Sequence, residues 1–480
     1  MKKLLLFICL AFTMQVNAQQ LISYEQVGAI SHAQMIQDYG IFIQYGVRLY
    51  AIEYTSLDLD GNSTNVSGLL VVPDDENRIF PRLVYQHGTV DSPEDVPSLL
   101  AGGYELAAVF GGMGYVTLAP DFLGLGVSEL FHPYVHADSE AQVAIDMLFA
   151  TEEIFDTSFG SLLNDQVFVT GYSQGGHAAM AAFQKLETEY ADDYTVTAAA
   201  PMSGPYDISG AMTDFTLGDN AYYFPAYLAY TALSYQEAYG TLFSSIGDFF
   251  KPEFAPMIQQ FYDREITLGT LNTFLINELT NLYGASVAKY SLLDDVLTAI
   301  ETDPNDPINV ALADNDVYDW TPLAPTRMFY CMADDQVTYQ NSLVAEAAML
   351  ANGATDVEAV DVDPSADHGG CVSPAVTQTI IFFAQFQEIG DYSATADLTA
   401  TQLKIAPNPT DGKVFITMPE NQSGQADIRL LDLKGKTYAN WQIENQGAKQ
   451  ELQLGQYPAG MYTLEIILNG QRFYSRLVIR

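Results

Sequence analysis

The sequence is poor in cysteine, histidine and basic residues. Its 480 residues include 3 Cys, 6 His and 19 Lys and Arg, against 60 Asp and Glu. So few Cys and His argue against zinc fingers and zinc ribbons, whose ligands come in spaced sets. The formal net charge of −41 repels phosphate backbones and anionic lipid headgroups, so we do not expect the chain to bind nucleic acid.

The negative charge lies almost entirely before residue 399. Between Gln19 and Leu398 there are 8 Lys and Arg against 53 Asp and Glu, whereas the residues from Thr399 onward carry 9 against 7. A well-solvated surface accounts for this excess, and a salt-adapted habitat is an alternative reason.

Apolar runs long enough to cross a membrane are also lacking. The run LLLFICLAF is too short for a span, follows Lys2 and Lys3, and leads to the small-residue site Val16-Asn17-Ala18. This pattern is typical of a secretory signal peptide over residues 1–18, with a buried N-terminal helix as the alternative. Cleavage would leave two cysteines in an export route that permits disulfides.

What the chain does have is a series of short apolar runs that end in Gly, Asp or Ser. Two alternating runs, RLYAIEYTSLDLDG and NVSGLLVVP, first predict a hairpin around Asp60-Gly61. Later runs such as PRLVYQHG, GYVTLAPD and DQVFVTGYS alternate with helical stretches. Buried strands that alternate with helices predict an α/β fold with a mostly parallel sheet covered on both faces. Chemistry in such a sheet lies at the carboxyl ends of the strands.

Three segments depart from this alternation of strands and helices. Residues 206–322 are helical and aromatic in composition, and we interpret them as a cap inserted in a catalytic domain over 19–390. Residues 391–403 are small and polar, as in a linker. Residues 404–480 show short strands and turns, which predict a small all-β sandwich.

The strongest local motif surrounds Ser173. A strand, the pattern Gly171-Tyr172-Ser173-Gln174-Gly175 and an Ala-rich helix follow one another. Glycines two residues before and after a serine permit a very tight strand-to-helix turn, which presents the hydroxyl above the sheet. We therefore predict that Ser173 is a nucleophile, although the five-residue pattern alone occurs by chance in many proteins.

A serine nucleophile needs a base and a carboxylate that orients it, in the chain order Ser, Asp, His for this fold. His177 follows too closely on the helix after Ser173 and is expected to be packed or capping. His368, which we expect in a polar loop after the last strand of the sheet, is the candidate base. Of the adjacent Asp334 and Asp335, Asp334 directly follows the preceding strand, and we choose it as the acid. Asp335 is then a solvated or loop-capping residue.

An oxyanion must also be stabilised. The backbone N–H of Gln174 is one expected donor, and a second should come from the Gly88-Thr89 stretch after the strand PRLVYQ. His87 is expected to be structural, because it precedes the serine. A metal site at His87, His132 and His136 lacks ligand spacing, so we expect neither metal nor cofactor.

Several of these motifs together resemble the secretory lipase family of the α/β-hydrolase fold. They are YQHGT, GYVTLAPDFLGLG, HPYVHADSEAQVAIDMLFA, GYSQGG and MADDQV, and the resemblance covers residues 58–389. It implies a triad of Ser173, Asp334 and His368 and hydrolysis of acylglycerols or other apolar esters. Nothing in the cap matches a motif, so chain-length preference and interfacial activation are not implied.

The tail resembles the type A C-terminal sorting domain of the type IX secretion system. The matching pieces are IAPNPTDGKVFI, LLDLKGK, YPAGMYTLEI and RLVIR. The resemblance implies export through the periplasm, contact of residues 404–480 with the secretion machinery, and release or attachment at the outer surface. A carbohydrate-binding sandwich is the alternative.

Three rivals to an esterase of simple apolar esters remain open. A serine peptidase can use the same triad, because a fold does not fix the substrate. An esterase for bulky polymeric or plant-wall esters differs only in substrate. A non-catalytic binding protein is disfavoured, because every member of the triad is present.

The two remaining cysteines bracket the predicted acid and base. Cys331 precedes Asp334 by three residues, and Cys371 follows His368 by three. Since the acid and base loops must meet, we predict a Cys331–Cys371 disulfide that stabilises the fold by about 3–4 kcal/mol through loop closure. Two buried free thiols are the alternative.

Overall fold

The computed structural model of the chain describes the residue ranges 19–40, 43–155, 159, 162–391, 405–408, 410, 412–417, 424–432, 436–445, 449–458, 460–468 and 471–479. These residues divide at Asp391 into two compact units. The predicted signal peptide lies outside the described residues, as does the predicted linker apart from its first residue. No described helix is both long and apolar enough to cross a membrane.

The first unit is built on a ten-stranded sheet in the order β1-β2-β3-β5-β4-β6-β7-β8-β9, with β10 paired to β4. Its strands are β1 (Leu21–Ile30), β2 (Val47–Leu57), β3 (Ser63–Pro73), β4 (Arg78–Gln86), β5 (Val116–Pro120), β6 (Leu163–Tyr172), β7 (Val196–Met202), β8 (Thr326–Tyr330), β9 (Val357–Asp361) and β10 (Gly390–Asp391). Six adjacent strands pair in parallel, in the order β5, β4, β6, β7, β8 and β9. The predicted mostly parallel α/β sheet is therefore confirmed.

The antiparallel end of the sheet comes from the N-terminal part of the chain. β2 and β3 form the hairpin expected at Asp60-Gly61, and β3 pairs antiparallel to β5. The sequence analysis did not predict β1, which pairs antiparallel to β2 at the edge. Most residues of β1 are exposed, so the strand carries no alternation of apolar and polar side chains.

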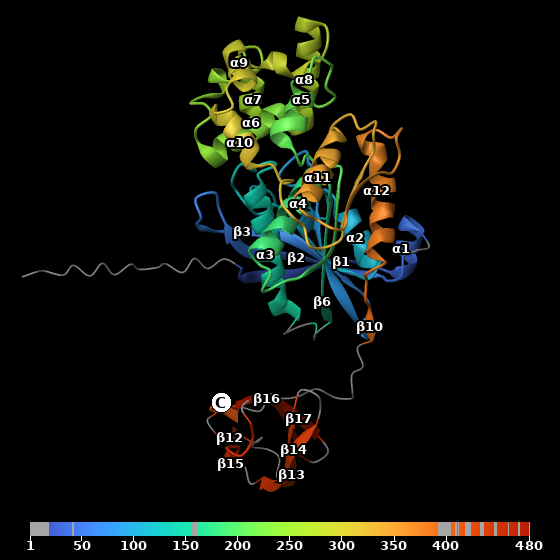
Figure 1. Cartoon of the computed structure of the whole chain (residues 1–480), viewed down its shortest axis with the longest axis vertical. Coiled ribbons are helices and arrows are strands. Elements are labelled where there is room, and N and C mark those ends of the chain that lie inside the picture. Colours follow the sequence, from blue (N-terminus) through green and yellow to red (C-terminus); the bar gives the residue numbers. More distant parts are fainter. Residues whose placement is uncertain are drawn as a thin grey trace, which may run out of the picture. The chain divides into compact units, whose positions relative to one another are not determined.

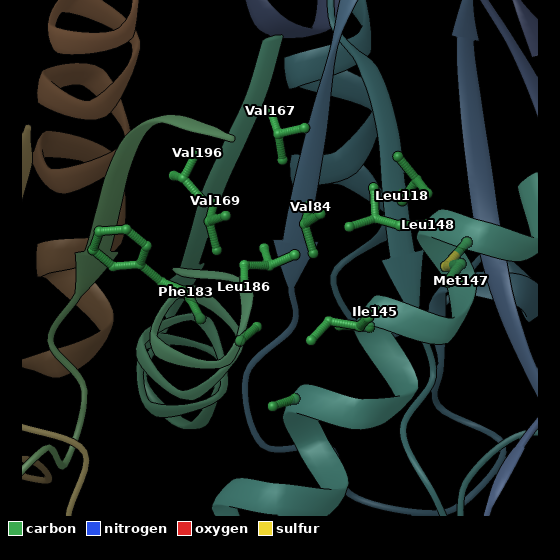
Figure 2. Close-up of a cluster of buried hydrophobic side chains, with 14 of the residues drawn as sticks. Val84, Leu118, Ile145, Met147, Leu148, Val167, Val169, Phe183, Leu186 and Val196 are labelled. Atoms are coloured by element: carbon green, nitrogen blue, oxygen red, sulfur yellow. The ribbon is translucent and has the colours of Figure 1, made fainter. Parts of the chain in front are cut away.

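Helices cover both faces of the sheet (Figure 1). The helices α3 (Ala137–Ile154), α4 (Gln174–Thr188) and α11 (Gln340–Ala351) share one buried cluster with the sheet. On the other face lie α1 (His32–Tyr39), α2 (Tyr104–Gly112) and α12 (His368–Phe383). Alternate residues of each inner strand point to opposite clusters, since Val167 and Val169 of β6 face α3 and α4 (Figure 2) and Phe168 faces α12.

Between β7 and β8 the chain forms a layer of helices over one end of the sheet (Figure 1). They are α5 (Thr213–Thr216), α6 (Ala226–Tyr239), α7 (Ala255–Tyr262), α8 (Leu268–Tyr283), α9 (Asp294–Thr302) and α10 (Pro307–Asp314). These helices have their own buried cluster, rich in aromatic side chains. We refer to this layer, residues 206–322, as the cap.

The position of His368 differs from the prediction of a loop. His368 is the first residue of α12, which begins six residues before Pro374. Asp367 caps this helix, because its side chain accepts a hydrogen bond from the Gly370 N–H at 2.8 Å. The cap residue and the buried face of α12 stabilise a helix that begins before Pro374.

The second unit consists of two antiparallel sheets, β14-β13-β16-β17 and β11-β12-β15. The strands are β11 (Ile405–Ala406), β12 (Lys413–Thr417), β13 (Gly424–Asp432), β14 (Thr437–Asn445), β15 (Lys449–Gln453), β16 (Gly460–Leu468) and β17 (Gln471–Ile479). Both sheets contribute to one apolar cluster, which includes Ile416, Ile428 and Leu464. The small all-β tail is thus present.

Candidate active site

Ser173 occupies a sharp turn between β6 and α4. Its backbone has φ 64° and ψ −124°, a conformation that costs a non-glycine residue about 1–3 kcal/mol. A Cβ placed on Gly175 would lie 2.0 Å from the Gln86 carbonyl oxygen, and one on Gly171 would lie 2.1 Å from the Gly175 carbonyl oxygen. Both positions therefore require glycine, which is the steric role expected from the pattern.

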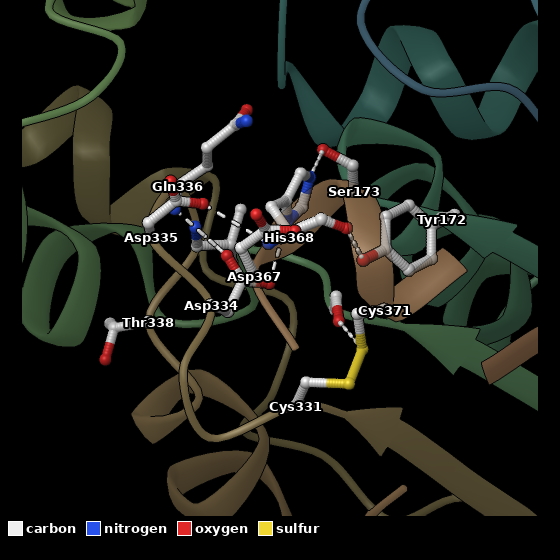
Figure 3. A network of polar contacts seen from close by, with 12 residues as sticks. Tyr172, Ser173, Cys331, Asp334, Asp335, Gln336, Thr338, Asp367, His368 and Cys371 are labelled. Atoms are coloured by element: carbon white, nitrogen blue, oxygen red, sulfur yellow. Dashed lines mark hydrogen bonds and ion pairs between the residues drawn. A yellow bond between two sulfur atoms is a disulfide. The ribbon is translucent and has the colours of Figure 1, made fainter. Parts of the chain in front are cut away.

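The three residues of the predicted triad lie in hydrogen-bonding order (Figure 3). His368 Nε2 is 2.9 Å from Ser173 Oγ, and His368 Nδ1 is 2.7 Å from Asp334 Oδ2. A carboxylate only accepts, so Nδ1–H donates to Asp334 and Nε2 is left to accept from the serine hydroxyl. All three side chains are buried. This is the arrangement that a serine, a general base and an orienting acid require.

The second oxygen of Asp334 fixes the carboxylate on its own loop. Oδ1 accepts hydrogen bonds from the backbone N–H groups of Gln336, at 3.0 Å, and Val337, at 2.9 Å. The adjacent Asp335 accepts a hydrogen bond from the His368 backbone N–H at 3.2 Å (Figure 3). The sequence analysis did not foresee this contact. Both aspartates thus hold His368, one by its ring and one by its backbone.

Tyr172, directly before Ser173, also contacts His368. Its hydroxyl donates to the His368 carbonyl oxygen at 2.6 Å. Burial, and then the nearby Asp334 carboxylate, raise the pKa of the Tyr172 phenol far above its usual value, so the group stays a donor. This contact joins the turn of the nucleophile to the first turn of α12, and no sequence pattern indicated it.

Cys331 and Cys371 form the predicted disulfide. Cys331 directly follows β8, Cys371 lies in the first turn of α12, and their Cα atoms are 5.9 Å apart. Both are fully buried, and 40 residues separate them in the chain. The disulfide therefore links the acid loop directly to the helix that carries the base (Figure 3).

The predicted oxyanion donors lie next to the nucleophile. Gln174 is the first residue of α4, where a backbone N–H has no acceptor within the helix. A Cβ on Gly88 would be 3.7 Å from the Ser173 Cβ, so this backbone runs beside the serine. The Thr89 hydroxyl is 3.0 Å from that of Tyr134, which lines the same cavity as Ser173. The assignment of these donors stays a prediction.

The other histidines near the site are engaged elsewhere. The ring of His87 is 2.8 Å from the Gly88 carbonyl oxygen through Nδ1 and packs on Phe122. His177 is fully buried, with Nδ1 2.8 Å from Glu140 Oε2. Neither ring is hydrogen-bonded to Ser173, which agrees with the structural roles expected for both.

A cavity leads from Ser173 and Gln174 into the cap. Most of its lining side chains are apolar and come from cap helices and their connections, among them Ile208, Leu228, Phe249, Ile308 and Leu312. The tyrosines of the cap meet the acid loop here, because the hydroxyls of Tyr222 and Tyr227 donate to the backbone and side chain of Gln336. The candidate nucleophile therefore lies where an apolar group can enter.

Comparison with known proteins identifies the tail. Residues 404–480 match the family model of the secretion system C-terminal sorting domain. The predicted type IX sorting domain is confirmed, and it indicates secretion or attachment at the outer surface. A search of curated proteins found no match for the chain.

Solved structures resemble the first unit. The rice cell wall degrading esterase LipA of Xanthomonas oryzae aligns over 77% of this chain and 98% of its own, with 22% identity and a TM-score of 0.66. A Legionella pneumophila protein assigned as a hydrolase aligns over 76% and 98%, with 28% identity and a TM-score of 0.69. Lipase A of Candida antarctica in its closed state aligns over 77% and 82%, with 15% identity and a TM-score of 0.58.

These likenesses confirm the structural resemblance to the secretory lipases that the motifs indicated. At such low identity they establish the fold, without assigning substrate or catalytic residues. The chain thus combines a lipase-like α/β-hydrolase fold with a C-terminal sorting domain.

Proposed function

We propose that the chain is a secreted serine carboxylic ester hydrolase with Ser173 as nucleophile, His368 as general base and Asp334 as the orienting acid. The observation that carries the proposal is the hydrogen-bonded order Ser173–His368–Asp334, with distances of 2.9 and 2.7 Å, at the mouth of an apolar cavity. An apolar cavity beside a nucleophile favours acyl groups of fatty or aromatic character over charged peptide segments.

The mechanism has two steps. His368 takes the proton of Ser173 while the serine oxygen attacks the ester carbonyl, and the resulting imidazolium is stabilised by Asp334. The protonated base then gives its proton to the leaving alcohol, which departs and leaves an acyl-enzyme. Water, activated by the same histidine, releases the acid. The N–H of Gln174 and a donor from Gly88-Thr89 stabilise the negative oxygen of each tetrahedral intermediate.

Hydrolysis of p-nitrophenyl butyrate tests the proposal. Ser173→Ala should abolish turnover and labelling by a fluorophosphonate, whereas Ser342→Ala, at a buried serine of α11, should retain both. Turnover that survives in folded Ser173→Ala contradicts the assignment of the nucleophile.

A series of esters from two to sixteen acyl carbons, run beside aminoacyl-arylamides, then defines the substrate class. A preference for arylamides would replace the esterase by a peptidase of the same fold.

A further inference from the structure

A buried polar network lies behind the proposed oxyanion donor. Gln174 is 2% exposed. Its Nε2 is 2.8 Å from Glu140 Oε1 and 2.7 Å from His132 Nε2. Both amide hydrogens of Gln174 therefore have acceptors, on α3 and on the segment that precedes it.

The protonation of His132 follows from its contacts. Nδ1 lies 2.7 Å from the Leu123 carbonyl oxygen, which only accepts, so Nδ1 carries the hydrogen and Nε2 accepts from Gln174. Burial lowers the pKa of His132 to about 4, which is consistent with this neutral form.

Glu140 is the centre of the network and is 1% exposed. Oε1 accepts from Gln174 Nε2 and from the Val135 backbone N–H at 3.2 Å, and Oε2 lies 2.8 Å from His177 Nδ1. His177 Nε2 lies 2.9 Å from the Asn315 carbonyl oxygen at the end of α10. Three donors thus surround a carboxylate that water does not reach.

We propose that Glu140 is a positioning residue, which clamps the side chain of Gln174 and thereby holds the Gln174 backbone N–H toward the oxyanion. The inference rests on the proposed serine esterase function. A backbone donor is effective only if it is already aimed at the position where charge develops. The clamp supplies this aim through the side chain of the residue that follows Ser173.

Glu140→Met and Glu140→Gln test the clamp. Methionine fills the site without an acceptor, and we expect kcat for p-nitrophenyl butyrate to fall about 10- to 100-fold with KM changed less than about threefold. Glutamine keeps an oxygen that accepts from Gln174, so Glu140→Gln should restore kcat to within about threefold of wild type.

Two further readouts separate positioning from mere stability. The inhibition constant of butylboronic acid, whose adduct with serine mimics the tetrahedral intermediate, should rise in Glu140→Met by the same factor by which kcat falls. Asp146→Asn is the matched control, because Asp146 is a buried carboxylate on the same helix that bonds Ser56 and Gln142 instead. Asp146→Asn should leave both kcat and the inhibition constant of butylboronic acid at their wild-type values.

Several outcomes overturn the proposal. Folded Glu140→Met with kcat within threefold of wild type does so, and so does an equal loss in Asp146→Asn. If Glu140→Met does not fold, Gln174→Met removes the same hydrogen bond from the other side, and unchanged kcat there is equally decisive against the clamp. If wild type hydrolyses no ester and Ser173 takes no fluorophosphonate, the proposed function fails first and the clamp fails with it.

Discussion

The two sides of the candidate active site are held together by different forces. On the acid and base side, a disulfide joins the loop of Asp334 to the helix of His368. On the nucleophile side, glycine packing and a buried polar network hold Ser173 and Gln174. A covalent bond tolerates loops that water partly reaches, whereas a polar network is strong only where water is excluded. The first side should thus respond to reductant and the second to protonation.

The largest expected effect separates the two adjacent aspartates of the acid loop. Asp334→Asn should lower kcat by about 10⁴-fold, because an amide cannot hold the imidazole in the tautomer that accepts from serine. Asp335→Asn keeps an oxygen for the His368 N–H and should lower kcat less than about tenfold. Ester kinetics at saturating substrate measure both. A larger loss in Asp335→Asn would reverse the assignment of the acid.

Removal of the disulfide tests how much the bond stabilises the acid and base side of the site. The Cys331→Ala/Cys371→Ala double variant should lose about 4 kcal/mol of unfolding free energy, since a loop of 40 residues is no longer closed in the unfolded chain. Urea unfolding of wild type with and without reductant gives the same comparison. If the double variant is as stable as wild type, the acid and base side is held by other contacts.

His132 gives the corresponding test for the nucleophile side. Its folded pKa of about 4 lies below the unfolded value of about 6.5, so the folded state binds fewer protons in this interval and loses stability as pH falls through it. The loss should reach about 3 kcal/mol between pH 7 and pH 4. The difference in unfolding free energy between wild type and His132→Gln measures this contribution. A difference that is independent of pH contradicts it.

The smallest effect concerns the contact between cap and acid loop. Tyr227→Phe removes the hydrogen bond from its hydroxyl to Gln336 Oε1, of 3.0 Å, and should lower the unfolding free energy by about 1 kcal/mol. Tyr283→Phe, at a 41% exposed position of α8, should change it by less than about 0.5 kcal/mol. Equal values in the two variants would mean that the cap does not brace the acid loop.

The parallel part of the fold was predictable because its strands are buried on both faces. Runs such as VFV in β6 are apolar throughout and lie shortly before turn residues, a pattern that predicts a buried strand. The exposed edge strand β1 has no such pattern, and the start of α12 depends on Asp367 as a cap seven residues before Pro374. Both features are decided by neighbours in space.

The candidate triad was predictable because few residues could compete for its roles. Only two histidines follow Ser173, and chain order selected His368 between them. The contacts of Asp335, Tyr172 and Glu140 depend on distances between segments far apart in the chain.

The disulfide has a practical consequence for anyone who produces the protein. In a reducing cytosol the two cysteines stay reduced. A chain expressed there therefore lacks the covalent link between the loop of Asp334 and the helix of His368. Such material can be folded and soluble and still have a loosened acid and base pair. Expression directed to an oxidising compartment, with free thiols counted before any assay, is therefore the condition under which a weak activity can be attributed to the enzyme.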